Sequence, residues 1–196
     1  MLSPGRPDAA AWWARRGLGP LLLAPLEGWT LIVPAGNVQA RPPYDDAVRT
    51  LAGRPVGWRM RPSLGFFHVG RQAVITLHPR RRPRSVRWLI WTPHDGSVPP
   101  RGLPAARIAD VVAAADAGPA AEEALSALLA EGAAEAHEVL RAALEILNLP
   151  GADVLFGDTD PATLPGARKI RPPDRYARAF DRLLREERRH RAEQET

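Results

Sequence analysis

A cluster of arginines beside tryptophans is the feature of this sequence best suited to binding chemistry. Residues 80 to 91 include five arginines and two tryptophans, namely Arg80, Arg81, Arg82, Arg84, Arg87, Trp88 and Trp91. Guanidinium groups form charge-assisted hydrogen bonds with phosphate oxygens, and indole rings stack on bases. The cluster therefore predicts a surface that contacts nucleic acid or an acidic protein face.

The overall charge supports this prediction, but codon usage offers another explanation. The formal net charge is +5 and the pI is near 10.8, values that attract polyanions. All basic residues except Lys169 are arginine, and Ala, Gly and Pro are abundant, as expected for a bacterial genome rich in G and C. The alternative is a solvated loop with Trp88 in the core. If the arginines act together, we expect them to converge with Arg59, Arg61 and Trp91 on one concave face.

Two carboxylates give the alternative of a metal-dependent enzyme. Asp158 and Asp160 are two residues apart and could share a cation such as magnesium, although Asp160-Pro161 is also typical of a turn or helix cap. The chain has no cysteine, which excludes thiolate metal sites and thiol nucleophiles. It also has no phosphate-binding loop, nucleophile elbow or dinucleotide fingerprint. We therefore favour a non-enzymatic protein without a cofactor.

The chain shows no targeting or membrane signal. The longest apolar run near the start, residues 21–26, is broken by Pro25, and a bilayer span needs about 20 apolar residues. These observations, with the absence of cysteine, predict a cytoplasmic protein with no membrane contact. They leave the oligomeric state open.

Residues 1–103 are predicted to form a β-rich half. Turn residues and apolar patterns predict two hairpins, one of strands 19–26 and 28–34 and one of strands 64–69 and 73–77. A short helix is predicted between the hairpins at 42–51, and a further strand at 86–92. Trp12 and Trp13 precede the first strand and are predicted to lie in the core.

Residues 104–196 are predicted to form a helical half. Apolar residues at helical spacing predict three alanine-rich helices and a last helix from about 174 that frays at its C-terminal end. The expected fold is α+β: a largely antiparallel sheet of five to seven strands from 19 to 93, with helices on one face or end, packed as one domain. The main rival to nucleic-acid binding is an immunity or adaptor protein that uses this half, with Tyr176 and Phe180, to bind another protein.

The order of segments from Trp12 to Leu103 resembles the N-terminal domain of bifunctional DNA primase-polymerases, in the compact form found in high-GC actinobacteria. The resemblance covers under half of the chain and rests on Trp12-Trp13, the strand at 30–34, the run at 64–68, Arg87-Trp88, and Pro93 ahead of a helix opening at Leu103-Pro104.

The resemblance has two implications for the site. In that family a similar strand carries metal-binding carboxylates, but this chain has Ile32 there and no acidic pair. It therefore implies a catalytically silent relative that cannot perform two-metal nucleotidyl transfer. It also implies that His68, which matches a histidine of the family motif, contacts a nucleotide phosphate.

Overall fold

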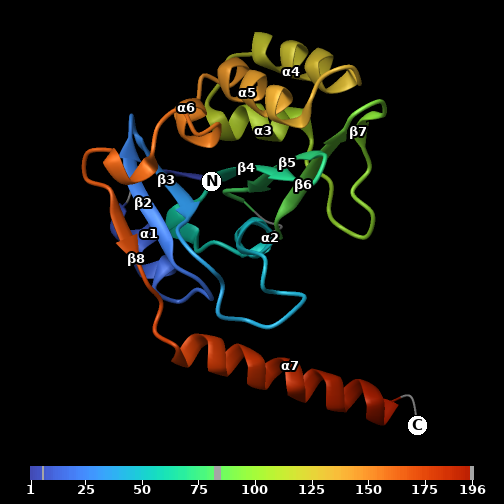
Figure 1. The fold of residues 1–196 in the computed structure, drawn as a ribbon. Coiled ribbons are helices and arrows are strands. Elements are labelled where there is room, and N and C mark those ends of the chain that lie inside the picture. Colours follow the sequence, from blue (N-terminus) through green and yellow to red (C-terminus); the bar gives the residue numbers. More distant parts are fainter. Residues whose placement is uncertain (6, 82–84, 195–196) are drawn as a thin grey trace.

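The computed structural model describes residues 1–5, 7–81 and 85–194, so Arg82 and Arg84 lie outside the described residues. The central element is an eight-stranded antiparallel sheet with the order β7-β6-β5-β4-β1-β3-β2-β8 (Figure 1). Its strands are β1 (Leu2–Pro4), β2 (Leu21–Leu26), β3 (Trp29–Pro34), β4 (Ser63–Val69), β5 (Gln72–His78), β6 (Arg87–Thr92), β7 (Gly96–Val98) and β8 (Arg168–Ile170). The predicted α+β class is confirmed.

Both predicted hairpins are confirmed. Glu27 and Gly28 join β2 to β3 with φ of 31° and 84°, and Gly70 at φ 62° leads into β5. A positive φ suits glycine because it has no Cβ, so the Gly positions allow the tight turns. The predicted strand at 86–92 is also present as β6.

One face of the sheet is covered by helices from the C-terminal half of the chain. These are α3 (Ile108–Ala115), α4 (Ala120–Ala130), α5 (Ala136–Ile146) and α6 (Ala152–Leu155), seen above the sheet in Figure 1. Their apolar stripes bury Val111, Leu125 and Leu140 completely against strand residues such as Leu64 and Leu89. The three alanine-rich helices predicted from the sequence are α3, α4 and α5, and α6 was not predicted.

The opposite face is also covered, contrary to the prediction of helices on one face or end. It packs against α1 (Pro7–Ala14), α2 (Ala47–Gly53) and the 3₁₀ turn η1 (Trp58–Met60). The helix predicted at 42–51 begins later, because Asp46 caps α2 by accepting a hydrogen bond from the Arg49 amide at 2.9 Å. Trp13 is buried as predicted, whereas Trp12 is 57% exposed, so only one of the pair lies in the core.

The last helix, α7 (Arg175–Gln194), projects away from the sheet at the bottom of Figure 1. Phe180 packs edge to face on Tyr44 with 5.1 Å between ring centroids, so part of its apolar side is covered by this same chain. Within the described residues, no helix combines the length and apolar character needed to cross a bilayer.

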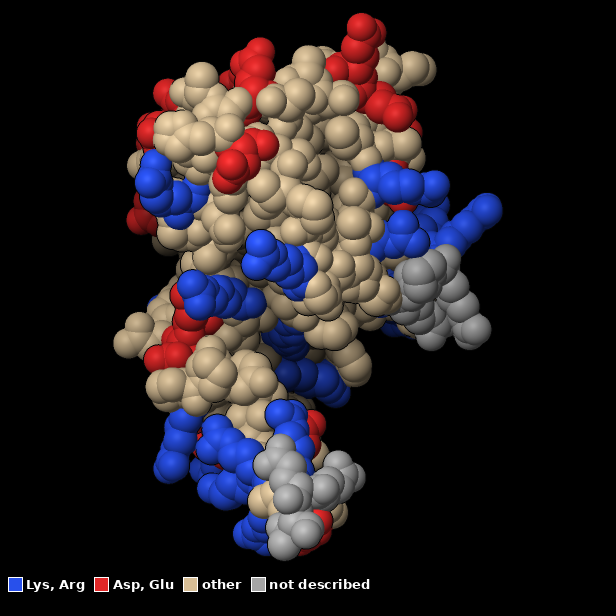
Figure 2. Space-filling view, turned by 90° about the vertical axis from the view of Figure 1, so that its right-hand side faces the viewer, with Lys and Arg blue, Asp and Glu red and all other residues tan. Residues whose placement is uncertain are grey.

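Charge is unevenly distributed over the face of the molecule shown in Figure 2. Figure 2 shows most of the acidic side chains at the top, over the layer of α4 and α5, and most of the basic ones below it and along α7. α7 alone carries seven arginines and four acidic residues.

Candidate nucleic-acid interface

A groove between α3 and the ends of several strands gathers part of the predicted arginine cluster. Its volume is about 660 Å³. Its charged lining comprises four arginines and two aspartates, a formal charge of +2, from Arg80, Arg81, Arg87, Arg107, Asp110 and Asp116. The remaining lining is apolar and includes Trp29, Pro4, Pro62 and Pro79. We refer to this cavity as the basic groove.

Arg80 and Arg81 are held at the groove by the segment that precedes them. The Arg61 guanidinium donates hydrogen bonds to the Val56 carbonyl at 3.0 and 3.1 Å and to the Pro79 carbonyl at 3.4 Å. These hydrogen bonds fix the chain where it leaves β5. Arg80 and Arg81 are both exposed, and neither has an acidic partner within 4.0 Å among the described residues. Their charges are therefore available to a bound anion.

Arg87 and Arg107 share the carboxylate of Asp110. Arg87 begins β6 and donates to Asp110 Oδ2 at 3.0 Å, while Arg107 donates to both carboxylate oxygens at 2.9 and 2.8 Å. The hydrogen bond from Arg107 lowers the pKa of Asp110 below its usual value of 3.8, and the charges of Arg107 and Arg87 lower it further, against the opposing effect of desolvation. Asp110 thus stays ionised at neutral pH and offsets part of the positive charge.

Trp29 supplies the aromatic surface of the groove. It begins β3, where it pairs with Pro4 of β1, and its indole is partly buried against the core. An indole beside arginines can stack a base while the guanidinium groups bind phosphates. Sequence reasoning missed Trp29 because it lies about 50 residues before the arginine cluster, and only the strand order β4-β1-β3 brings the two together.

Several predicted contact residues lie elsewhere. Trp91 is 0% exposed, with its Nε1 donating to the Glu131 carbonyl at 2.7 Å, so it belongs to the core and cannot contact a partner. Trp88 follows Arg87 in β6, so its side chain lies on the opposite face of the sheet, where it is partly buried against the core that includes Trp13 and Val74. The expected convergence with Arg59, Arg61 and Trp91 is not found, because none of the three lines the basic groove. Trp91 is buried, Arg61 donates to backbone carbonyls, and Arg59 lines a different cavity.

His68 is exposed but lies at the other end of β4 from the groove. It pairs with Ala73 of β5, whereas the groove is lined by Pro62, just before β4. His68 is six positions after Pro62 along the extended chain, a distance of about 20 Å. His68 is thus not part of the basic groove.

The alternative metal site finds no support in the geometry. Asp158 accepts a hydrogen bond from Arg141 at 2.9 Å, and Asp160 caps the 3₁₀ turn η2 (Pro161–Thr163) by accepting from the Ala162 amide at 2.9 Å. In the described part of the chain, no group of three or more His, Cys, Asp or Glu side chains is placed to hold a metal ion. Both carboxylates therefore have structural partners of the kind expected for a surface pair and a helix cap.

Comparison of the chain with protein-family models, curated proteins and solved structures finds no match.

Proposed function

We propose that this protein is a non-enzymatic binding protein for single-stranded nucleic acid and that the basic groove is its binding site. The proposal rests on one observation: Arg80, Arg81 and Trp29 line the same groove. Among the described residues, neither arginine has an acidic partner. Cationic grooves with stacking side chains are the common solution for binding single strands without strong sequence preference.

The binding mode follows from the two kinds of side chain. Arg80 and Arg81 contact successive phosphates, and Trp29 stacks on a base that lies between the sugar-phosphate backbone of the bound strand and α3. A single strand suits this geometry because its bases are free to stack, whereas those of a duplex are paired and stacked on one another. The groove volume of about 660 Å³ is in the range of ligand-sized cavities and accommodates one or two nucleotides at a time.

This function is compatible with a catalytically silent relative of primase-polymerases, in which strand binding is kept without the metal-binding carboxylates. It is also compatible with the cytoplasm, which is the compartment that we propose. The rival proposal of an adaptor that binds through Tyr176 and Phe180 is weakened because Phe180 already packs on Tyr44.

A binding titration tests the proposal. A fluorescently labelled single strand of about 20 nucleotides is titrated with the wild type, with the R80A/R81A variant and with R71A/R101A, at about 50 mM salt. The control variant loses the same charge at exposed positions that do not line the groove. We expect R80A/R81A to weaken binding at least tenfold and R71A/R101A to weaken it less than threefold. No binding by the wild type, or equal losses in the two variants, would contradict the proposal.

A further inference from the structure

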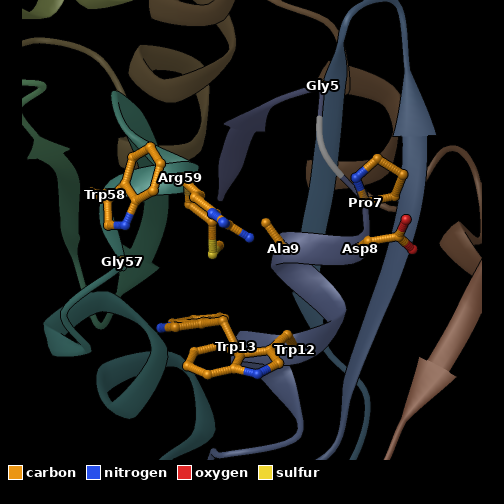
Figure 3. Close-up of a pocket in the computed structure, with 10 residues that line it drawn as sticks. Gly5, Pro7, Asp8, Ala9, Trp12, Trp13, Gly57, Trp58 and Arg59 are labelled. Atoms are coloured by element: carbon orange, nitrogen blue, oxygen red, sulfur yellow. The ribbon is translucent and has the colours of Figure 1, made fainter.

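A second cavity, of about 780 Å³, lies between α1 and η1 on the other face of the sheet (Figure 3). Trp12 and Trp13 of α1 lie across it from Trp58 and Arg59 of η1. Trp12 is 57% exposed and Trp58 is 73% exposed. Two exposed indoles around one cavity are a sign of ligand binding, because tryptophan is normally buried where packing allows. We call this cavity the tryptophan pocket.

Each tryptophan of this pocket has an arginine on its ring. The guanidinium carbons of Arg16, Arg54 and Arg59 lie 3.5, 3.7 and 5.2 Å from the ring centres of Trp12, Trp13 and Trp58. Burial lowers the pKa of Arg54 to about 10, so even this guanidinium is charged at neutral pH. Of these three arginines only Arg59 lines the pocket itself. The pocket thus combines aromatic surfaces with one cation, which favours an occupant with a planar ring and a negative charge.

One carboxylate also lines the pocket. Asp8 accepts a hydrogen bond from Arg168 at 3.3 Å, which offsets part of its charge. Its side chain is almost fully exposed, so it can accept a further hydrogen bond from an amino or imino group of a ligand. Nucleobases present such donors, and a nucleotide also supplies the negative charge that Arg59 favours.

The tryptophan pocket and the basic groove have lining residues that are neighbours along the chain. Pro4 lines the groove and the next residue, Gly5, lines the pocket. Pro62 lines the groove while Met60, two residues earlier, lines the pocket. Consecutive Cα atoms are 3.8 Å apart, so lining residues of the two cavities lie close together at the end of β1, although the cavities are on opposite faces of the sheet. A nucleic-acid strand bound to both cavities must pass around this end of β1.

We propose that the tryptophan pocket binds a nucleobase of the same single strand whose phosphates occupy the basic groove. The base stacks against Trp12 and Trp58, and its phosphate contacts Arg59. This inference rests on the proposed function, because it assumes that a strand lies in the groove. An apolar side chain of a protein partner is the competing occupant, and it predicts no dependence on bases.

The test compares a labelled strand of 12 thymidines with an abasic strand of the same length, which keeps the phosphates and lacks the bases. The proteins are the wild type, W12A/W58A, W12F/W58F and the single variant W58A. We expect the wild type to prefer the thymidine strand at least tenfold. W12A/W58A should bind the thymidine strand about tenfold more weakly and the abasic strand as the wild type does, and W12F/W58F should restore most of the loss.

The outcomes separate the two proposals. Unchanged thymidine binding by W12A/W58A and W58A, with normal binding by the wild type, would overturn this inference and leave the basic groove in place. Failure of the wild type to bind either strand would overturn both. Thermal unfolding shows whether each variant is folded, and W58A, at a largely exposed position, keeps the test decisive if Trp12 is needed for folding.

Discussion

Arg87 and Asp110 form an ion pair with 3.0 Å between Nη1 and Oδ2, which joins the first residue of β6 to the first turn of α3. Because Arg107 contacts the same carboxylate at 2.8 Å, one negative charge holds two of the four arginines of the basic groove. Asp110 therefore organises the wall of the groove and also lowers its positive charge.

Removing that charge should strengthen binding rather than weaken it. D110N keeps the size of the side chain and its ability to accept a hydrogen bond, and it frees one unit of positive charge. We expect the affinity for a single strand to rise about two- to fivefold at 50 mM salt, with less of a gain at 200 mM because salt screens the added charge. The ion pairs are partly exposed, so stability should fall by no more than about 1 kcal/mol. Weaker binding by a folded D110N would mean that the carboxylate itself contacts the ligand.

Trp29 should contribute through its ring and not only through its apolar bulk. W29L retains an apolar side chain against the core but has no aromatic face. We expect about tenfold weaker binding of a single strand, in line with about 1 to 3 kcal/mol for stacking one base. W29F should recover most of the affinity. Titration of the three proteins, with urea unfolding to compare their stability, distinguishes stacking from packing, because a packing role alone would change stability and leave affinity unchanged.

A buried histidine should make the fold sensitive to acid. His78 is 0% exposed in β5, beside Ser63 of β4, and its two ring nitrogens have no hydrogen-bond partner among the described residues. Burial lowers its pKa from 6.5 to about 4, and the charge of Arg61 adds to the effect. The unfolded chain thus binds a proton below about pH 6.5 while the folded chain stays neutral until about pH 4. Acidification through this range favours unfolding by roughly 3 kcal/mol.

Urea unfolding from pH 7 to pH 4.5 tests this expectation. H78F removes the buried imidazole, so the free energy of unfolding should change much less between pH 7 and pH 4.5. Stability at pH 7 should be equal or higher, because the two unpaired ring nitrogens of His78 are removed from the core. H68Q is the matched control, since His68 is exposed and should leave the acid dependence as in the wild type. An unchanged acid dependence in H78F would show that another group is responsible.

The parts of the fold that the sequence predicted are those with strong local patterns. The apolar runs of β4 and β5 and the helical stripes of α3, α4 and α5 are local, so each segment carries its own signal. The three-residue strands β1, β7 and β8 are too short to show any period. They form because longer neighbours present unpaired backbone groups to them.

The candidate site was predicted only in part because its residues converge from distant segments. The exposed Arg80 and Arg81 follow directly from a charged run after a strand. Trp91 was expected at the surface but is buried, since it lies on the face of β6 that packs in the same core as α3, α4 and α5. Trp29 and Arg107 join the groove through the strand order and the position of α3, which no local pattern encodes.

The salt dependence of binding tests the central claim most directly. The affinity for a labelled single strand is measured from about 50 to 200 mM salt for the wild type and for R80A/R81A. If Arg80 and Arg81 each neutralise a phosphate, the slope of log K against log salt should become shallower by about 1.4 in the double variant, or about 0.7 for each contact. An identical slope in the two proteins, or a wild-type affinity that does not change with salt, would contradict the claim that the basic groove binds the phosphates of a nucleic acid.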